Sequence, residues 1–361
     1  MKKLFLLPTI LFSLNSFATV RTVSNSPATL AQFNTIQAAV DASASGDSVY
    51  VHGSPNEYVG FTITGKQLVI IGPGWEPDKD LPHTAYINTN IVLTDAGSSG
   101  TEIQGLTLVA GITIASAGIN DIHIIRNHFI NNSISISIPN SGIYSNYTIE
   151  GNWFTQSGIR VASNNTYENF LIQNNIFHMN VCCYGNSLTG EFTNVTSVVF
   201  NHNLFYGATG STGFNPIFNS GGNNGLIFTN NIFVKRTVDV KNSSFTNNIT
   251  FGSDINTPWA INGNVDAGGN LANQDPQMND QVAINAGTDN PLLNYTIATG
   301  PANNSAADGK DMGLLFDAVG SLNWANSRNS RLPRISKINI INPTVQVGGV
   351  ISVSVEAKTS N

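Results

Sequence analysis

The chain has 361 residues, a formal net charge of −6 and only 11% charged residues. Soluble domains usually carry about a quarter charged residues, so the surface of this protein must consist largely of neutral polar side chains. The acidic balance argues against nucleic acid as a partner, because nucleic-acid-binding proteins present a basic face. Cys182 and Cys183 are adjacent, and a disulfide between neighbours would be strained, so disulfides are not expected to stabilise the fold.

The first 18 residues have the pattern of a secretory signal peptide. Two lysines precede an apolar run at positions 4–14, and Ser16 and Ala18 place small residues where such peptides are cleaved. The run is too short to span a bilayer. We therefore expect a protein that is secreted to the periplasm, the cell surface or the medium, without insertion into a membrane.

One phrase recurs through the middle of the chain: an apolar residue, a spacer, an apolar residue, two spacers, Asn, a spacer and Phe. The Asn positions lie 17 to 28 residues apart, and the last copy has Thr in place of Phe. These positions are Asn127 and Phe129, Asn152 and Phe154, Asn175 and Phe177, Asn203 and Phe205, Asn231 and Phe233, and Asn248 and Thr250. Self-similarity at such a period indicates a repeat architecture.

The phrase describes one coil of a solenoid. Alternation at a spacing of two sends apolar side chains to one side of a strand, and the spacers before Asn break the alternation as a tight corner does. We expect the Asn itself to adopt the left-handed backbone conformation of this corner. Stacked corners then align the Asn side chains in one column and the Phe rings in another. The predicted fold is all-β, a right-handed parallel β-helix.

A short helix is predicted ahead of the first coils, with Asn34 or Thr35 placed to cap it. Four apolar residues fall at helical spacing there: Phe33, Ile36, Ala39 and Val40. The string FNTIQAAVD at 33–41, followed by GDSVYV at 46–51, resembles the N-terminal cap of the pectin-lyase-like β-helix superfamily. The resemblance extends over residues 30 to about 316. It implies the β-helical fold but no single activity, since the superfamily includes lyases, esterases, hydrolases and non-catalytic adhesins.

These patterns predict five segments in chain order. They are the signal peptide (1–18), an N-terminal cap (19–47), the parallel β-helix (48–316), a linker (317–331) and a C-terminal segment (332–361). In the last segment, alternating apolar residues on both sides of Gly348-Gly349 predict a β-hairpin or part of a β-sandwich module. Residues 301–313 are interpreted as the closing coil of the β-helix.

Carboxylates are scarce where sugar cleavage would need them. No Asp occurs between Asp121 and Asp239, and that interval holds only Glu150, Glu168 and Glu191. Glycoside hydrolysis needs two carboxylates about 5–9.5 Å apart, and the polygalacturonase motifs Asn-Thr-Asp, Asp-Asp and Gly-His-Gly are absent. Hydrolase activity is therefore not expected.

No cofactor motif is present, and calcium is only weakly indicated. Asn262-x-Asn264-x-Asp266 has the spacing of a calcium loop, but Ala267 stands where such a loop needs Gly, so a plain turn is preferred.

Four basic residues are candidates for an elimination reaction, which needs one base and a cation that neutralises a carboxylate. They are Arg126, His128, Arg160 and His178. An ordinary surface role is the alternative for each of them.

Four further residues are candidates for holding a sugar chain. Trp153 and Tyr184 are expected to be exposed aromatics that stack on sugar rings. Asp239 and Lys241 are expected to face outward from the same strand column as Arg160.

Two functions from different classes remain open. The first is a secreted, non-catalytic β-helix that acts as a monomer and binds extracellular polysaccharide or serves as a surface scaffold. The second is a polysaccharide lyase that acts on uronate-containing glycans.

Overall fold

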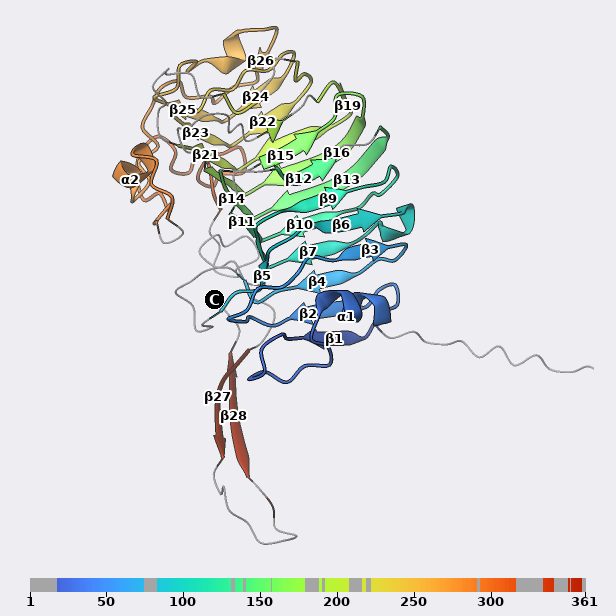
Figure 1. Cartoon of the computed structure of the whole chain (residues 1–361). Helices are drawn as coiled ribbons and strands as arrows, with labels where there is room; N and C mark the ends of the chain where they lie inside the picture. Colours follow the sequence, from blue (N-terminus) through green and yellow to red (C-terminus); the bar gives the residue numbers. More distant parts are fainter. Residues whose placement is uncertain are drawn as a thin grey trace, which may run out of the picture.

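The computed structural model is a solenoid of parallel strands in three long sheets (Figure 1). It describes residues 18–74, 83–130, 134–138, 141–156, 158–178, 188–189, 192–207, 216–218, 222–290, 293–315, 334–340, 350 and 352–358. Residues 1–17 of the predicted signal peptide, the linker at 317–331, the two cysteines and Tyr184 lie outside these ranges. The architecture confirms the predicted right-handed parallel β-helix.

Sheet A holds the first strand of each coil, and its neighbouring strands are parallel. Its strands are β1 (Val20–Val23), β2 (Ser48–Val51), β4 (Val69–Ile71), β7 (Glu102–Gln104), β10 (His123–Ile125), β13 (Ile143–Glu150), β16 (Thr166–Gln173), β20 (Val198–Asn201), β22 (Ile227–Thr229), β24 (Ser244–Thr246) and β26 (Val265–Asp266), with β19 (Asn194–Val195) beside β16. The sheet thus begins at Val20, inside the segment predicted as the cap, where β1 pairs in parallel with β2.

Sheets B and C hold the second and third strands of the coils. Sheet B contains β5 (Tyr86–Ile87), β8 (Thr107–Leu108), β11 (His128–Phe129), β14 (Trp153–Thr155), β17 (Ile176–His178), β21 (Leu204–Tyr206), β23 (Ile232–Val234) and β25 (Ile249–Phe251). Sheet C contains β3 (Thr62–Thr64), β6 (Ile91–Thr94), β9 (Ile112–Ile114), β12 (Ile134–Ile138), β15 (Gly158–Val161) and β18 (Leu188–Thr189). Two 3-10 turns, η1 (Ala96–Ser98) and η2 (Pro258–Ala260), lie in the loops.

The Asn residues of the repeated phrase form a buried ladder at the corner between sheets A and B. Asn152 Oδ1 accepts the backbone N–H of Asn127 at 2.9 Å, and Asn175 Oδ1 accepts that of Asn152 at 2.9 Å. The same bond repeats through Asn203, Asn231 and Asn248 and ends on Asn270. Each buried backbone donor is thereby satisfied by the next coil, as a buried polar group requires. The predicted column is confirmed.

The Phe residues form a second buried column behind the ladder. The ring centroids of Phe154 and Phe177 lie 4.6 Å apart with planes 1° from parallel, and those of Phe177 and Phe205 lie 4.7 Å apart. Phe129 and Phe233 extend the column at its two ends. The period of the phrase therefore sets the register of the whole solenoid.

At each corner, the residue in the left-handed conformation is the one before the ladder Asn. The sequence pattern predicts this conformation for the ladder Asn itself. These residues have φ between +51° and +64°: Arg126, Gly151, Asn174, His202, Asn230 and Asn247. Turning the chain one position earlier leaves the next side chain pointing inward, so the ladder Asn reaches its neighbour from an ordinary backbone conformation. The predicted placement was wrong by one residue.

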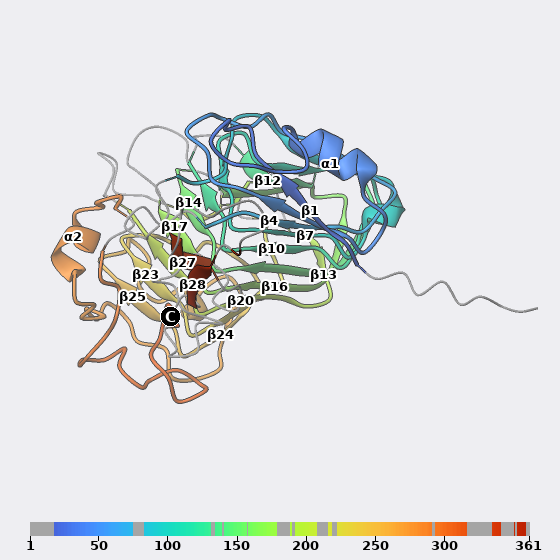
Figure 2. The same cartoon turned by 90° about the horizontal axis from the view of Figure 1, so that it is seen from below.

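Helix α1 (Ile36–Ala42) lies beside β1 at the start of the solenoid (Figure 2). The Thr35 hydroxyl caps it by accepting the N–H of Ala38 at 3.3 Å. Ile36, Ala39 and Val40 are buried, so the helix packs its apolar face against the first coils. This confirms the predicted helix and its cap.

After β26 the chain folds back over the outer face of sheet B instead of adding a closing coil. We call residues 271–290 and 293–315, which include helix α2 (Gln281–Asn285), the strap. Strands of sheet B contribute outward apolar side chains to a second buried cluster, and the strap covers them. The cluster includes Trp153, Ile176, Leu204, Tyr206, Ile232 and Val234 from the sheet, and Met278, Ile284, Tyr295, Ile297, Met312 and Leu314 from the strap. The interpretation of 301–313 as a closing coil is therefore wrong.

The C-terminal segment contains an antiparallel pair, β27 (Arg334–Ile340) and β28 (Val353–Lys358). These strands include Ile338 and Ile340 and Val353 and Val355 of the predicted alternation, and residues 341–349, with the predicted turn at Gly348-Gly349, lie outside the described residues. No helix within the described ranges is both long and apolar enough to cross a bilayer.

Candidate functional site

The outward side of sheet C carries one in-register row of mostly hydroxyl side chains. The row consists of Thr62, Val92, Thr113, Ser137 and Arg160. The alternate residues, such as Ile112, Ile136 and Ile159, are buried in the core. Because strand neighbours point to opposite faces, these isoleucines fix the direction of the row, and a rigid core supports it.

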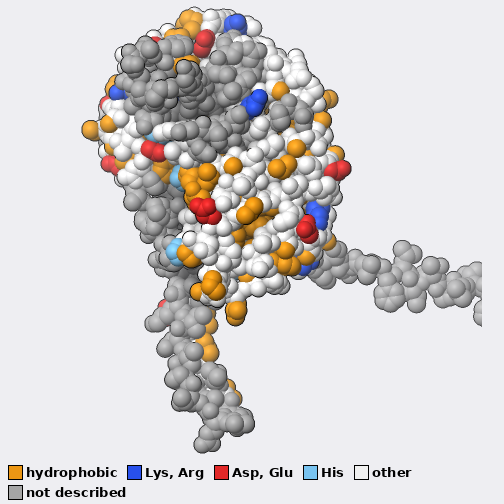
Figure 3. Space-filling model, viewed as in Figure 1, with side chains coloured by type: hydrophobic (Ala, Val, Ile, Leu, Met, Phe, Trp, Pro, Cys, Tyr) orange, Lys and Arg blue, Asp and Glu red, His pale blue; other side chains and the backbone are white. Residues whose placement is uncertain are grey.

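Arg160 is the cation of this row, and its side chain is exposed. Its described neighbour in the row is Ser137, which carries no charge. A guanidinium presents donors in a planar fork that fits a carboxylate, and hydroxyls both donate and accept hydrogen bonds. The row can therefore hold a polyhydroxylated chain and pair with one of its acidic groups. Neutral polar surface predominates on the face shown in Figure 3, where charged side chains are sparse.

Asp239 and Lys241 do not share a strand with this row. Sheet C ends at β18 within the described ranges, and the later segment is tied to its neighbours by single bridges, one of them between Asn224 and Lys241. Lys241 is exposed, and Asp239 Oδ1 accepts Nδ2 of Asn262 at 3.1 Å. Val238 and Val240 are buried, so Asp239 between them faces outward, and the placement of Asp239 and Lys241 in the strand column of Arg160 stays a prediction.

Trp153 is buried, with 1% of its surface exposed. It belongs to the apolar cluster beneath the strap, and its ring stacks on that of His128 with centroids 4.7 Å apart. The prediction that Trp153 is an exposed sugar platform is wrong, because the outward face of sheet B is covered. Tyr184, the other predicted platform, lies outside the described residues.

His128 is also unsuited to act as a base. Burial lowers its pKa to about 3, and its Nε2 lies 3.2 Å from the hydroxyl of Thr155. A general base works best when its pKa is near the working pH, so a neutral imidazole with this pKa would accept a proton poorly.

His178 is fully buried and anchors the strap. Its Nε2 lies 3.0 Å from the carbonyl oxygen of Gly287, and its Nδ1 lies 3.5 Å from Oδ1 of Asp289. Burial lowers the pKa of His178 and raises the pKa of Asp289. Both ring nitrogens face the strap, so this candidate has no open side toward a substrate.

His202, the corner residue between β20 and β21 in the next coil, makes a similar pair of contacts with the strap. Its Nδ1 lies 2.9 Å from the carbonyl oxygen of Gly313, and its Nε2 lies 3.4 Å from Oδ2 of Asp308. Burial lowers the pKa of His202. The neutral imidazole is therefore the form that holds the strap.

Three other left-handed corner residues bind the strap as well. Asn247 Nδ2 donates to the carbonyl oxygen of Ser305, Asn230 Oδ1 accepts the N–H of Ala307, and Asn174 Oδ1 accepts the N–H of Leu315, each at 2.7 Å. Sequence reasoning missed this role. The sequence could have indicated this role, because Asn or His occupies corner positions where Gly would adopt the positive φ more easily. A polar side chain at such a position suggests a hydrogen bond to another segment.

Arg126 occupies a corner beside Glu150 on sheet A. Burial raises the pKa of Glu150, while a hydrogen bond with Gln173 and the charges of Arg126 and His123 oppose that rise. Glu102 lies two strands away and in the other outward row of the sheet, about 10 Å along the axis at the usual strand spacing. The two carboxylates do not match the separation that a glycosidase needs.

The weakly indicated calcium loop has other roles. Asn264 Nδ2 donates to the carbonyl oxygens of Val240 and Pro258, and Asn262 bonds Asp239. Across the described ranges, no group of three or more His, Cys, Asp or Glu side chains is arranged to hold a metal ion. These side chains stabilise the last coils.

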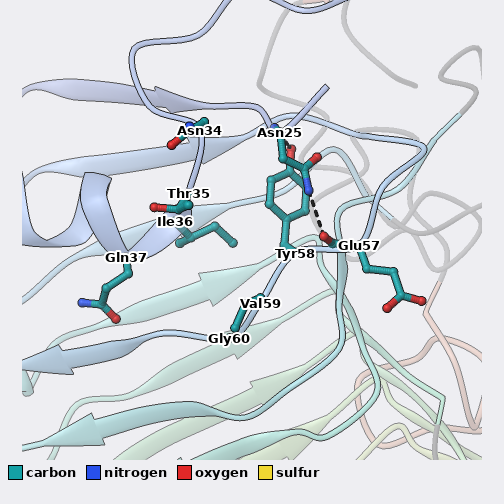
Figure 4. Close-up of a pocket in the computed structure, with 9 residues that line it drawn as sticks. All are labelled: Asn25, Asn34, Thr35, Ile36, Gln37, Glu57, Tyr58, Val59 and Gly60. Atoms are coloured by element: carbon teal, nitrogen blue, oxygen red, sulfur yellow. Dashed lines mark hydrogen bonds between the residues drawn. The ribbon is translucent and has the colours of Figure 1, made fainter. Parts of the chain in front are cut away.

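A cavity of about 330 Å³ opens at the N-terminal end, between Asn25, the start of α1 and residues 57–60 (Figure 4). Asn25 Nδ2 donates to the carbonyl oxygen of Glu57 at 2.8 Å. The side-chain oxygen of Gln37 accepts the backbone N–H of Thr62 at 2.8 Å. Much of the polar lining therefore holds the cap on the first coils.

No protein-family model matches this chain, and no curated protein matches it. The crystal structure of pectate lyase Pel9A is similar, with 14% sequence identity and a TM-score of 0.39, over 87% of this chain and 97% of that one. At this identity and TM-score, the similarity assigns no activity to this chain.

Proposed function

We propose that this protein is a secreted β-helix that binds an extracellular polysaccharide along the outward row of sheet C. The observation that supports it best is the in-register row of hydroxyls with the exposed guanidinium of Arg160. Parallel strands repeat about every 4.8 Å, so the row offers regularly spaced hydrogen-bonding groups on a rigid support. A chain that contains uronate residues would pair one carboxylate with Arg160.

Binding without cleavage fits the distribution of acids and bases. The row itself contains no carboxylate and no imidazole. His178 and His202 are buried beneath the strap. Hydrolysis would need two matched carboxylates on this face, and elimination would need a base within reach of the sugar ring.

A polysaccharide lyase is the second candidate, because Arg160 is placed to neutralise a uronate carboxylate. Elimination needs less machinery than hydrolysis, namely one base and one cation. This candidate is weaker because the two predicted bases make other contacts: His128 with Thr155, and His178 with Gly287.

The test uses the full mature chain and uronate polymers, with and without calcium. Retention on the immobilised polymer, ultraviolet absorbance of unsaturated products and new reducing ends are measured together. We expect retention without cleavage, and at least about a tenfold loss of affinity in Arg160→Ala, since charged bidentate contacts contribute about 1.5–3 kcal/mol. Lys310→Ala, which removes an exposed charge from the strap, is the matched control.

Three other outcomes would change the conclusion. Reducing ends without new absorbance would show hydrolysis and contradict the proposal. Both signals together, lost in Arg160→Ala, would establish the lyase. Absence of both retention and cleavage on all polymers would exclude glycan binding and leave a surface scaffold.

A further inference from the structure

Arg236 is a buried cation directly after strand β23. The chain turns at Lys235, with φ of +55°, and Arg236 follows with only 3% of its surface exposed. Its Nη2 donates to the carbonyl oxygen of Pro216 at 2.9 Å, and its own carbonyl oxygen accepts the hydroxyl of Ser253 at 2.8 Å. Its Nε is buried and has no hydrogen-bond partner among the residues that the structure describes. The guanidinium therefore has an unused donor inside the protein.

Arg236 also lacks a counter-charge within the part of the chain that the structure describes. Arg21 offers a contrast, because its Nη2 lies 3.4 Å from Oδ2 of Asp47. His178 lies close enough to Arg236 that the charge of Arg236 contributes to the lowered pKa of its imidazole. Asp289, the nearest acid to His178, bonds His178 and Thr155 instead.

The isolation of this charge is costly. An ion buried without a partner loses its hydration and gains no compensating attraction, which destabilises the folded state. Burial lowers the pKa of Arg236 only to about 10, so the side chain stays charged at neutral pH. An apolar residue of similar size would remove the penalty, yet the chain has arginine at this position.

We propose that Arg236 is the cation of an anion-binding site that takes a carboxylate or another small oxyanion. The anion would supply the missing counter-charge and the acceptor for the Nε–H donor, and guanidinium–oxyanion pairs are commonly formed through two parallel hydrogen bonds. The site goes beyond the proposed function, because Arg236 is buried just after β23, whereas Arg160 is exposed on sheet C. The anion comes either from a sugar acid or from a free ion, and the two sources share this chemistry.

The experiment is thermal unfolding of the full chain at constant ionic strength, with separate titrations of sodium galacturonate, sodium sulfate and neutral galactose. We expect a saturable rise in Tm of roughly 2 °C or more for wild type with an anion, since a ligand that binds only the folded state stabilises it. Galactose should give no rise. Arg236→Met should lose the response, and without added anion it should be at least as stable as wild type, because an isolated buried ion is replaced by an apolar side chain.

Arg21→Met is the matched control, since it removes an arginine that already has a carboxylate partner. It should lose stability and keep the anion response. A response to galacturonate alone would identify the sugar acid as the source, and a response to both anions would identify a general oxyanion site. Equal responses of wild type and Arg236→Met would overturn the proposal. If Arg236→Met does not fold, a wild-type Tm that does not change with the concentration of galacturonate or of sulfate overturns the proposal equally.

Discussion

The backbone N–H of Leu315 donates to Oδ1 of Asn174 at 2.7 Å, although 141 positions separate the two residues. Asn174 turns the corner of a coil with φ of +53°, and Leu315 is at the end of the strap. The bond therefore couples the corner geometry of the solenoid to the segment that covers sheet B. The same coupling recurs at His202, Asn230 and Asn247.

Asn174→Gly should loosen the strap without disturbing the corner, because Gly accepts positive φ at little cost. Losing one hydrogen bond costs about 0.5–1.5 kcal/mol, so hydrogen exchange at Leu315 should accelerate by roughly two- to tenfold. Asn146→Gly, at an exposed residue with φ of +62°, is the control. Unchanged exchange in Asn174→Gly would show that the bond does not hold the strap.

Phe177→Ala should be far more destabilising than Arg160→Ala. Phe177 is fully buried, and its ring stacks between those of Phe154 and Phe205, so truncation should cost about 3–5 kcal/mol. An exposed side chain such as Arg160 should contribute within about 0.5 kcal/mol. Urea denaturation measures both values. Similar costs would contradict the assignment of inward and outward faces.

Asn175→Ala should break the ladder at its centre. The Asn175 side chain accepts the N–H of Asn152 and donates to the carbonyl oxygen of Ile149, both in the interior. Each buried group left unsatisfied costs about 1–3 kcal/mol, so we expect a loss above about 3 kcal/mol in urea denaturation. Asn34→Ala, at an exposed position, should change stability little. A small effect at Asn175 would mean that water replaces the ladder bonds.

Stability should decrease as the pH falls below about 6.5, the usual pKa of an unfolded histidine. Burial lowers the pKa of His128, His178 and His202 in the folded state. Between the lowered values and 6.5 the unfolded chain binds protons that the folded chain does not, so acidification favours unfolding by up to about 1.4 kcal/mol per pH unit for each such histidine.

His202→Asn tests this histidine directly, because Asn tolerates the corner conformation. Urea denaturation at pH 7.0, 6.0 and 5.5 should give a shallower slope in the variant by up to one proton. Asp308 and Lys310 also act on His202, so the comparison is made against wild type rather than against an absolute slope. Identical slopes would show that folding does not shift the pKa of His202, contrary to the prediction.

The repeated phrase by itself determined the solenoid, because period, apolar alternation and buried amide are all local properties of the sequence. Asn127 and Phe129 could be assigned to the interior from their spacing alone, and Ile36 and Thr35 could be assigned to a capped helix. The exposed position of Arg160 followed from the same alternation. The left-handed residue was misplaced by one position, since the sequence pattern marks the corner but not the residue that turns it.

Only the tertiary structure decided what covers the outward faces. Alternation shows that Trp153 and His178 point away from the core. It does not distinguish an outward face that is exposed to solvent from one that another segment covers. The strap that buries them begins about 100 positions later, and its irregular sequence has no period from which its path could be read. The sequence therefore determined the coils through short-range geometry, whereas the burial of the histidines and the isolation of Arg236 depend on contacts between distant segments.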